Sequence, residues 1–192
     1  MVFSRYHLRM TGRLSDLLTR TARLIAGDGY WAGLKPAQWQ ALRYLAAANR
    51  FSRTPGALTA WLGQTKGTVS QTVAALERKG LVERSEDRDD RRLVRLALTP
   101  AGRALLAEAP ETVADAMTAG LTGDERAAIE PLLAHMLTEH LAQRGYRPFG
   151  LCAECRHFVR DAPDGAPHRC ALLALPLSAE DAGAICIEQE AA

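Results

Sequence analysis

The feature that most constrains this chain is a helix with one apolar stripe, which stops at a glycine and is followed by two short strands. The pattern occupies residues 62–102. Val69, Val73 and Leu76 recur at the spacing of one helix face, and Gly80 stands where a left-handed residue commonly ends a helix. The segment therefore predicts a helix–turn–helix joined to a β-hairpin.

The other face of this helix carries small polar side chains. Hydroxyl and amide groups of this size reach base edges or phosphates without filling the major groove of DNA. The composition of this face therefore favours a role in DNA recognition. The polar positions are Thr68, Ser70, Gln71 and Thr72.

Residues 82–84 and 93–98 are strand-like, and charged residues fill the tip between them. Arginine at such a tip enters the minor groove, where it responds to negative potential and groove width. A charge run by itself is more typical of a solvated turn on an ordinary α+β domain. The order of helix, glycine, strand, tip and strand favours DNA binding instead. The arginines of the tip are Arg88, Arg91 and Arg92, and the aspartates placed to pair with them are Asp87, Asp89 and Asp90.

In these motifs, residues 36–103 resemble the winged helix–turn–helix of the MarR (multiple antibiotic resistance regulator) family. Looser similarity in the flanking helices extends the resemblance over residues 1–145. In combination the motifs are specific, although each is weak by itself. The strongest matches are Gly80-Leu81-Val82-Glu83-Arg84, Asp90-Arg91-Arg92 and Leu98-Thr99-Pro100-Ala101-Gly102.

The resemblance implies a mainly α fold with a small β-wing (α+β). It also implies an intertwined homodimer whose two lobes face a palindromic operator on double-stranded DNA. The function implied is that of a transcriptional regulator, a repressor, and not an enzyme. By the same analogy, the groove-facing residues are Thr65, Lys66, Thr68, Ser70 and Gln71, with Arg88, Arg91 and Arg92 in the wing.

We expect four segments along the chain. An N-terminal dimerisation helix lies within residues 1–30, the DNA-binding domain spans 31–103, and C-terminal dimerisation helices span 104–146. A small irregular tail of residues 147–192 follows. Thr54 and Thr99 each precede a proline, which predicts a helix start at both places. Within the DNA-binding domain, Trp39 and Trp61 are expected in the core.

Charge divides the chain in the same way. Residues 1–103 hold 18 Lys and Arg against 8 Asp and Glu, a net charge of +10, whereas residues 104–192 hold 6 against 14, a net charge of −8. A basic first half suits phosphate contacts, which release counterions from DNA. No run approaches the roughly 20 apolar residues of a membrane span, and the N-terminus lacks a signal-peptide pattern. We therefore expect a cytoplasmic protein.

All four cysteines fall in the tail, with the spacing Cys-x2-Cys-x14-Cys-x15-Cys. Intracellular cysteines gathered in this way are more often metal ligands or redox centres than structural disulfides. A tail this short buries little core, so a bound metal is expected to help it fold. The candidate ligands are Cys152, Cys155, Cys170 and Cys186, and His157 and His168 are candidates to support these ligands or to replace one of them.

Four thiolates suit an iron–sulfur cluster, as [4Fe-4S] or [2Fe-2S], or a tetrahedral zinc ion. The segments 152–158 and 170–172 resemble the cluster-binding segments of high-potential iron–sulfur proteins, although no tryptophan lies nearby. This favours a cluster over zinc, and regulatory disulfides are a third alternative. We expect an apolar shell of Leu172, Leu173, Leu175, Leu177, Ile185 and Ile187, with Phe158.

The combined hypothesis is a MarR-type regulator whose cluster is sensitive to redox state or to a gas. In this hypothesis the cluster state sets how the tail packs against the dimerisation helices, and thereby the spacing of the two recognition helices. One alternative is a MarR-type regulator induced by an aromatic small molecule, with the tail as a structural zinc site. Another is an electron-transfer or redox module, which the basic first half disfavours.

Overall fold

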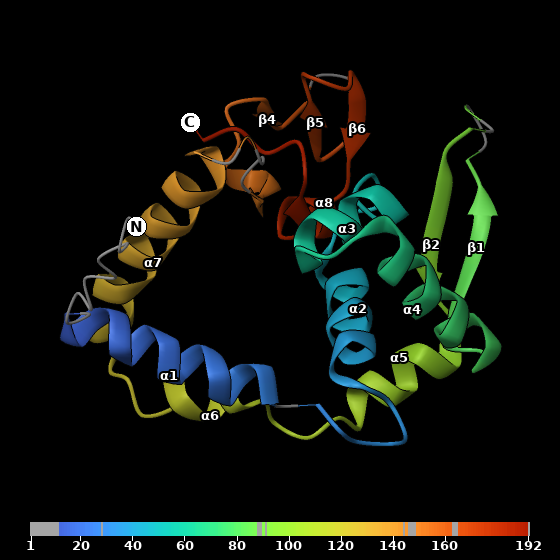
Figure 1. Ribbon diagram of the computed structural model, residues 1–192. Helices are drawn as coiled ribbons and strands as arrows, with labels where there is room; N and C mark the ends of the chain where they lie inside the picture. Colours follow the sequence, from blue (N-terminus) through green and yellow to red (C-terminus); the bar gives the residue numbers. More distant parts are fainter. Residues whose placement is uncertain are drawn as a thin grey trace, which may run out of the picture.

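The computed structural model has three parts: a winged lobe (residues 31–107), a helical arm, and a C-terminal tail (residues 149–191) that lies against the lobe (Figure 1). The arm combines the first helix of the chain with the helices that follow the lobe. The structure describes residues 12–27, 29–87, 90, 92–143, 145, 149–162 and 165–191. The predicted wing residues Arg88 and Arg91 lie outside these ranges.

The winged lobe contains four helices and one hairpin. Helices α2 (Pro36–Ala47), α3 (Pro55–Leu62) and α4 (Lys66–Arg78) precede strands β1 (Val82–Glu86) and β2 (Val94–Leu98), and α5 (Pro100–Ala107) closes the lobe. The strands are antiparallel, with Val82 opposite Leu98 and Glu86 opposite Val94. The expected helix–turn–helix and wing are therefore confirmed.

Threonine hydroxyls begin three of these helices. Thr54 Oγ1 accepts a hydrogen bond from the Ala57 N–H at 3.1 Å, and Thr99 Oγ1 accepts one from the Gly102 N–H at 3.0 Å. Thr65 caps α4 in the same way. Each cap satisfies a backbone donor that the first helical turn leaves free. The helix starts expected at Thr54 and Thr99 are confirmed.

The lobe core forms where the apolar stripes of its helices meet. Val69, Val73 and Leu76 of α4 are buried, as their spacing predicted, and Trp39 of α2 is only 2% exposed. Trp61 was wrongly placed in the core, because it is 42% exposed. Its ring lies at the lobe edge and packs against Phe149, with the two centroids 5.1 Å apart.

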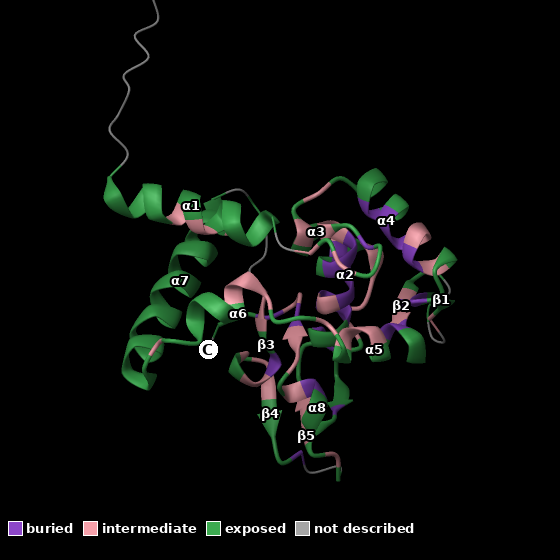
Figure 2. Cartoon of the chain, turned by 90° about the horizontal axis from the view of Figure 1, so that it is seen from below, coloured by how far each residue is buried: buried purple, intermediate pink, exposed green. Residues whose placement is uncertain are grey.

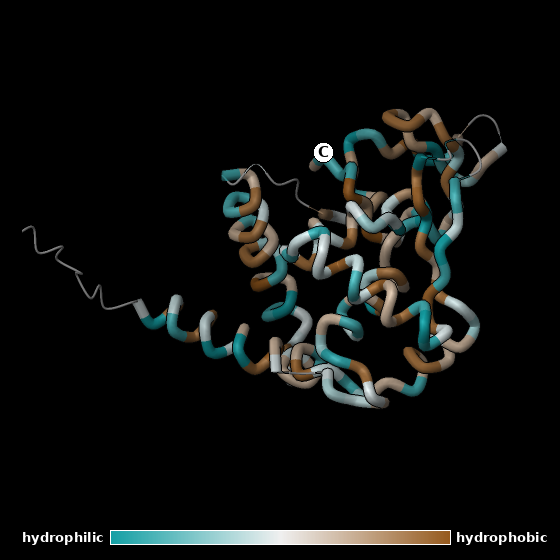
Figure 3. The backbone as a smooth tube through the Cα atoms, turned by 45° about the vertical axis from the view of Figure 1, so that its right-hand side comes forward, coloured by the Kyte–Doolittle hydropathy of each residue, from teal (hydrophilic) through white to brown (hydrophobic). Residues whose placement is uncertain are grey.

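The arm consists of α1 (Arg13–Gly27), α6 (Val113–Thr118) and α7 (Gly123–Gln143). Thr122 and Glu125 form a capping box at the start of α7, with the Thr122 N–H donating to Glu125 Oε2 at 2.9 Å and the Glu125 N–H donating to Thr122 Oγ1 at 3.3 Å. The arm helices bury none of their residues, unlike the helices of the lobe (Figure 2). Apolar positions nevertheless recur along α1 and α7 (Figure 3). Within the described ranges, no helix combines the length and apolar character that crossing a bilayer requires.

The tail is more regular than the sequence predicted. Its strands β4 (Phe158–Arg160), β5 (His168–Cys170) and β6 (Leu175–Leu177) form an antiparallel sheet, and β3 (Gly150–Leu151) pairs with β7 (Ile185–Cys186). A short η1 (Cys152–Glu154) and α8 (Ala179–Ala182) complete it. The strands have only two or three residues each, which is too short for a visible alternation of apolar and polar positions.

Gly102 fixes how α5 leaves the wing. The Thr99 N–H donates to the Leu81 carbonyl oxygen at 3.1 Å, so the first turn of α5 lies directly on Leu81. A Cβ at position 102 would clash with that carbonyl group, whose carbon would be 3.1 Å away. The match of residues 98–102 to the family motif thus has a packing reason.

We expect the Gly102→Ala substitution to lower the free energy of unfolding by about 1–3 kcal/mol, the usual cost of forcing a methyl group into a packed site. Thermal melting measures the effect. Gly123→Ala is the matched control, because a Cβ there meets nothing within 4 Å. Equal melting temperatures for the two variants would contradict this account of Gly102.

Candidate DNA-binding surface and cysteine site

The polar face of α4 is exposed as the sequence predicted, except at Thr72, which was placed on this face and is only 9% exposed. Two of its residues also stabilise the helix start, because Thr65 Oγ1 accepts from the Thr68 N–H at 3.2 Å and lies 2.9 Å from Thr68 Oγ1. The structure therefore brings the predicted groove-facing side chains together on one surface. They are Thr65, Lys66, Thr68, Ser70 and Gln71.

The wing presents Arg92 to solvent, with 95% of its side chain exposed. The Asp90 carboxylate binds Arg92 at two points. Its Oδ1 accepts a hydrogen bond from the Arg92 backbone N–H at 3.0 Å and lies 3.5 Å from Arg92 Nε. Asp87 was expected to orient an arginine of the tip. Its carboxylate pairs with Arg95 of β2, at 2.6 Å from Nε, a partner that the sequence did not predict.

The structure brings the four cysteines of the tail together. Cys152 and Cys186 are both buried, and Cys170 lies opposite Phe158 in the β4–β5 pair and packs against the same small cluster. Cys155 is joined to Cys152 through a backbone hydrogen bond of 3.2 Å. All four are free thiols.

Cys152 and Cys186 lie in one buried cluster, and their interaction shifts their pKa values in opposite directions. The pKa of Cys186 is lowered chiefly because the Cys152 thiol donates to its sulfur. The Asn49 side chain, the Glu188 backbone N–H and the Ser52 hydroxyl add to this effect. The pKa of Cys152 is raised by the same bond, by burial and by the charges of the other cysteines. The pair therefore favours one thiolate beside one thiol.

Two further polar groups lie near these sulfurs. The Glu190 N–H donates to Cys155 Sγ at 3.4 Å, and Asn49 Nδ2 is buried without a hydrogen-bond partner among the described residues. The Asn49 side chain contributes to lowering the pKa of Cys186. Donors around thiolate sulfurs suit a bound metal or cluster, because they hold the ligands in their charged form. The chemistry of the donor set thus fits the predicted cofactor class.

A single metal ion also requires that the side chains of its ligands converge on one point. Among the described residues, no three His, Cys, Asp or Glu side chains converge closely enough to hold one metal ion. A tetrahedral zinc site requires such convergence, with each sulfur about 2.3 Å from the ion. The structure therefore shows a thiol cluster with suitable donors and, within the same residues, no preformed single-ion site.

The predicted surroundings of the cysteines are only partly correct. Leu177 is buried, whereas Leu172, Leu173 and Leu175 are exposed on the β5–β6 hairpin. Leu172 and Leu173 lie in the turn of residues 171–174 and Leu175 begins β6, so the three side chains do not all face the sulfurs. Ile185 and Ile187 pack against the lobe core and not around the sulfurs alone.

The two histidines take different positions. His157 Nε2 lies 3.4 Å from the Glu190 carboxylate. The His168 ring packs against Phe158, with centroids 4.8 Å apart, and its Nδ1 is buried without a partner among the described residues.

The tail is fixed to the loop between α2 and α3, residues 48–54. The Asn49 N–H donates to the Ile185 carbonyl oxygen at 2.8 Å, and the Ile187 N–H donates to Ser52 Oγ at 2.9 Å. Arg50 donates to the Pro176 carbonyl oxygen and lies 3.5 Å from the Asp181 carboxylate. The tail thus docks on the lobe of the same chain, a contact that the sequence did not predict, and its packing against the dimerisation helices stays a prediction.

Sequence reasoning missed Asn49, Arg50 and Ser52. A short polar stretch between two helices is typical of an ordinary turn, and only its burial distinguishes it. Asn49 is 2% exposed and Ser52 is fully buried.

A cavity of about 260 Å³ lies where the lobe meets α8. This is somewhat smaller than the roughly 300–1,000 Å³ of typical small-molecule sites. Its lining is Leu45, Ala46, Arg53, Leu98, Arg103, Leu106 and Glu180. The alternative of an aromatic inducer remains a prediction.

Comparisons with known proteins agree with this geometry. The model of the MarR family matches residues 32–93. Among solved structures, the S. aureus MepR–DNA complex is 26% identical, covers 66% of this chain and 94% of its own, and has a TM-score of 0.50. The transcriptional regulator SlyA is 13% identical, covers 68% and 96%, and has a TM-score of 0.55.

A probable transcriptional regulator from Pseudomonas aeruginosa is 28% identical, covers 65% and 97%, and has a TM-score of 0.49. A search among functionally curated proteins gives no significant match. The match to the MarR family thus covers residues 32–93, most of the winged lobe.

We expect the Cys152→Ala substitution to raise the pKa of Cys186 in the reduced, metal-free protein, because it removes the main donor to that sulfur. A pH titration of thiolate ultraviolet absorbance measures the change. Cys170→Ala is the control, since Cys170 is not among the causes of the Cys186 shift. An unchanged lowest titration step in Cys152→Ala would show that the two thiols do not interact in solution.

Proposed function

We propose that this chain, a transcriptional regulator of the MarR type, is a homodimeric cytoplasmic repressor whose operator affinity is controlled by its cysteine tail. The observation that carries the DNA-binding part is the exposed polar face of α4 beside the wing. The same fold occurs in MepR, whose structure is a complex with DNA. The net charge of +10 over residues 1–103 supports phosphate binding.

The apolar surface of the arm supports the homodimer. Large apolar side chains lie exposed on α1 and α7, and a second copy with the same two helices would cover them. Two lobes held in this way reach half-sites about one helical turn, roughly 34 Å, apart. The exposed apolar residues of α1 and α7 are Leu14, Leu17, Leu24, Ile25, Ile129, Leu132, Leu133, Met136 and Leu137.

We expect the Gln71→Ala substitution to weaken binding to the operator by about 1–3 kcal/mol relative to random duplex, because an amide that reads a base edge is lost. Binding to random duplex should change little. Fluorescence anisotropy with both duplexes measures the difference, and Gln40→Ala on the exposed side of α2 is the matched control. Equal losses on both duplexes would assign Gln71 to phosphate contact and remove it from base reading.

For the tail we propose an iron–sulfur cluster held by Cys152, Cys155, Cys170 and Cys186. Four cysteine thiolates are the ligand set that iron–sulfur clusters commonly use. When bound, the cluster would supply a redox-active centre whose loss or oxidation is sensed. The residues of the chain supply four sulfurs, the Asn49 and Glu190 donors, and partial exclusion of water by Leu177 and Phe158.

We expect anaerobically purified protein to absorb visible light and to contain iron and sulfide, because reduced thiolates retain a cluster. Metal analysis of the wild-type protein and of Cys155→Ser tests this, and Ser85→Ala on the exposed side of β1 is the control. A colourless protein with one zinc per chain would replace the cluster with the zinc alternative. A metal-free protein with disulfides would favour a thiol switch.

A further inference from the structure

We propose that the α2–α3 loop and Arg95 are the positioning elements through which the tail sets the wing. The inference rests on the proposed function, since it names the route by which the tail would alter DNA binding. Each step of the route is a contact between described residues.

The first step joins the tail to the loop from several directions. The loop binds the residues on either side of Cys186, because the Asn49 N–H donates to the Ile185 carbonyl oxygen and the Ile187 N–H donates to Ser52 Oγ. Phe51 packs against the cluster of Cys152, Leu177 and Cys186. A change at the sulfurs therefore meets the loop directly, without passing through α7.

The second step is the set of buried hydrogen bonds that restrains the loop. Ser52 is fully buried, its N–H donates to Asn49 Oδ1 at 2.9 Å, and its carbonyl oxygen accepts from the Tyr44 hydroxyl at 2.8 Å. Removing one partner of such a buried polar group destabilises the folded state, because the other partner is left without a hydrogen bond. The loop thus moves as a unit.

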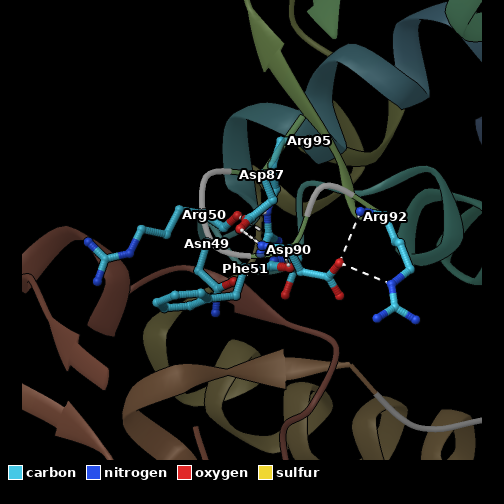
Figure 4. Close-up of polar contacts among 8 residues, drawn as sticks. Asn49, Arg50, Phe51, Asp87, Asp90, Arg92 and Arg95 are labelled. Carbon is cyan, nitrogen blue, oxygen red and sulfur yellow. Dashed lines mark hydrogen bonds and ion pairs between the residues drawn. The ribbon is translucent and has the colours of Figure 1, made fainter. Parts of the chain in front are cut away.

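The third step joins the loop to the wing. Arg95 of β2 donates from one guanidinium nitrogen to the Phe51 carbonyl oxygen at 2.8 Å, and its Nε pairs with Asp87 at 2.6 Å. Figure 4 shows Arg95 and Asp87 next to each other, close to the loop residues Asn49, Arg50 and Phe51. Only 24% of the Arg95 side chain and 17% of the Asp87 side chain are exposed, so solvent screens this pair weakly. The Leu96 N–H also donates to the Arg53 carbonyl oxygen, at 2.8 Å.

The fourth step runs along the end of the hairpin. Asp87 Oδ1 accepts from the Asp90 N–H at 3.2 Å, and the Asp87 N–H donates to the Leu93 carbonyl oxygen at 2.9 Å. Asp90 in turn holds Arg92. Arg95 therefore anchors Asp87, which binds Asp90, and Asp90 positions the exposed Arg92.

A double-mutant cycle on the full chain tests the route. Cys186→Ala perturbs the tail at the sulfurs, and Asp181→Asn perturbs it independently by weakening the contact with Arg50. Each is combined with Arg95→Gln, and operator affinity is measured by anisotropy at several salt concentrations. The matched control is Glu77→Gln, which breaks the 2.9 Å ion pair between α4 and Arg84 of the wing but lies off the route.

We expect each tail substitution to change operator affinity at least about fivefold with Arg95 present, within the usual range of coupling between sites. In the Arg95→Gln background the change should fall to about twofold or less, close to the limit at which uncoupled sites simply add. In the Glu77→Gln background it should persist. A full-size change in the Arg95→Gln background would overturn the route and leave control by the tail intact.

Hydrogen exchange of the free protein tests the route through the loop separately from the control of DNA binding by the tail. The tail substitutions should speed exchange at the Asp87 and Leu93 amides, whose hydrogen bonds close the hairpin end. Faster exchange with unchanged DNA affinity would support the route and contradict control of binding by the tail. Unchanged exchange at both amides would overturn the route, whatever the DNA affinity.

Discussion

Two buried polar residues in one short loop hold the parts of this molecule together. The Ser52 N–H donates to the Asn49 side chain, the Ser52 carbonyl oxygen accepts the Tyr44 hydroxyl, and both loop residues bind the end of the tail. Groups buried to this degree must keep their partners, since an unmade hydrogen bond costs about 1–3 kcal/mol. The position of the tail on the lobe therefore follows from polar satisfaction more than from apolar area.

This constraint changes the account of how the tail folds. Its own buried apolar side chains are few, with Leu177 the largest, and a segment of this size rarely holds together by itself. Ile185 and Ile187 add their apolar surface to the core of the lobe. Docking thus supplies stability that the sequence alone assigned to a bound metal, and a cofactor would add to a segment already placed.

The sequence predicted what depends on periodicity and local chemistry. The α4 stripe, the Thr54 and Thr99 caps and the wing all follow from neighbours in the chain. The burial of Ser52, the exposure of Trp61 and the docking of the tail could not be predicted, because they depend on partners far away in sequence. Asp87 shows the limit clearly: its role as a partner for arginine was expected, but its ion pair with Arg95 depends on the strand register and was not predicted.

A route through the loop would act differently from a change in dimer geometry. If the tail altered the arm, one tail would shift both lobes together, and the response would depend on the whole dimer. Contacts through Arg95 stay within one lobe, so each tail would adjust the wing of its own chain. The free-energy changes at two half-sites would then add, and the fold-changes in affinity would multiply. A modest shift at each wing would therefore be enough to release an operator held by two of them.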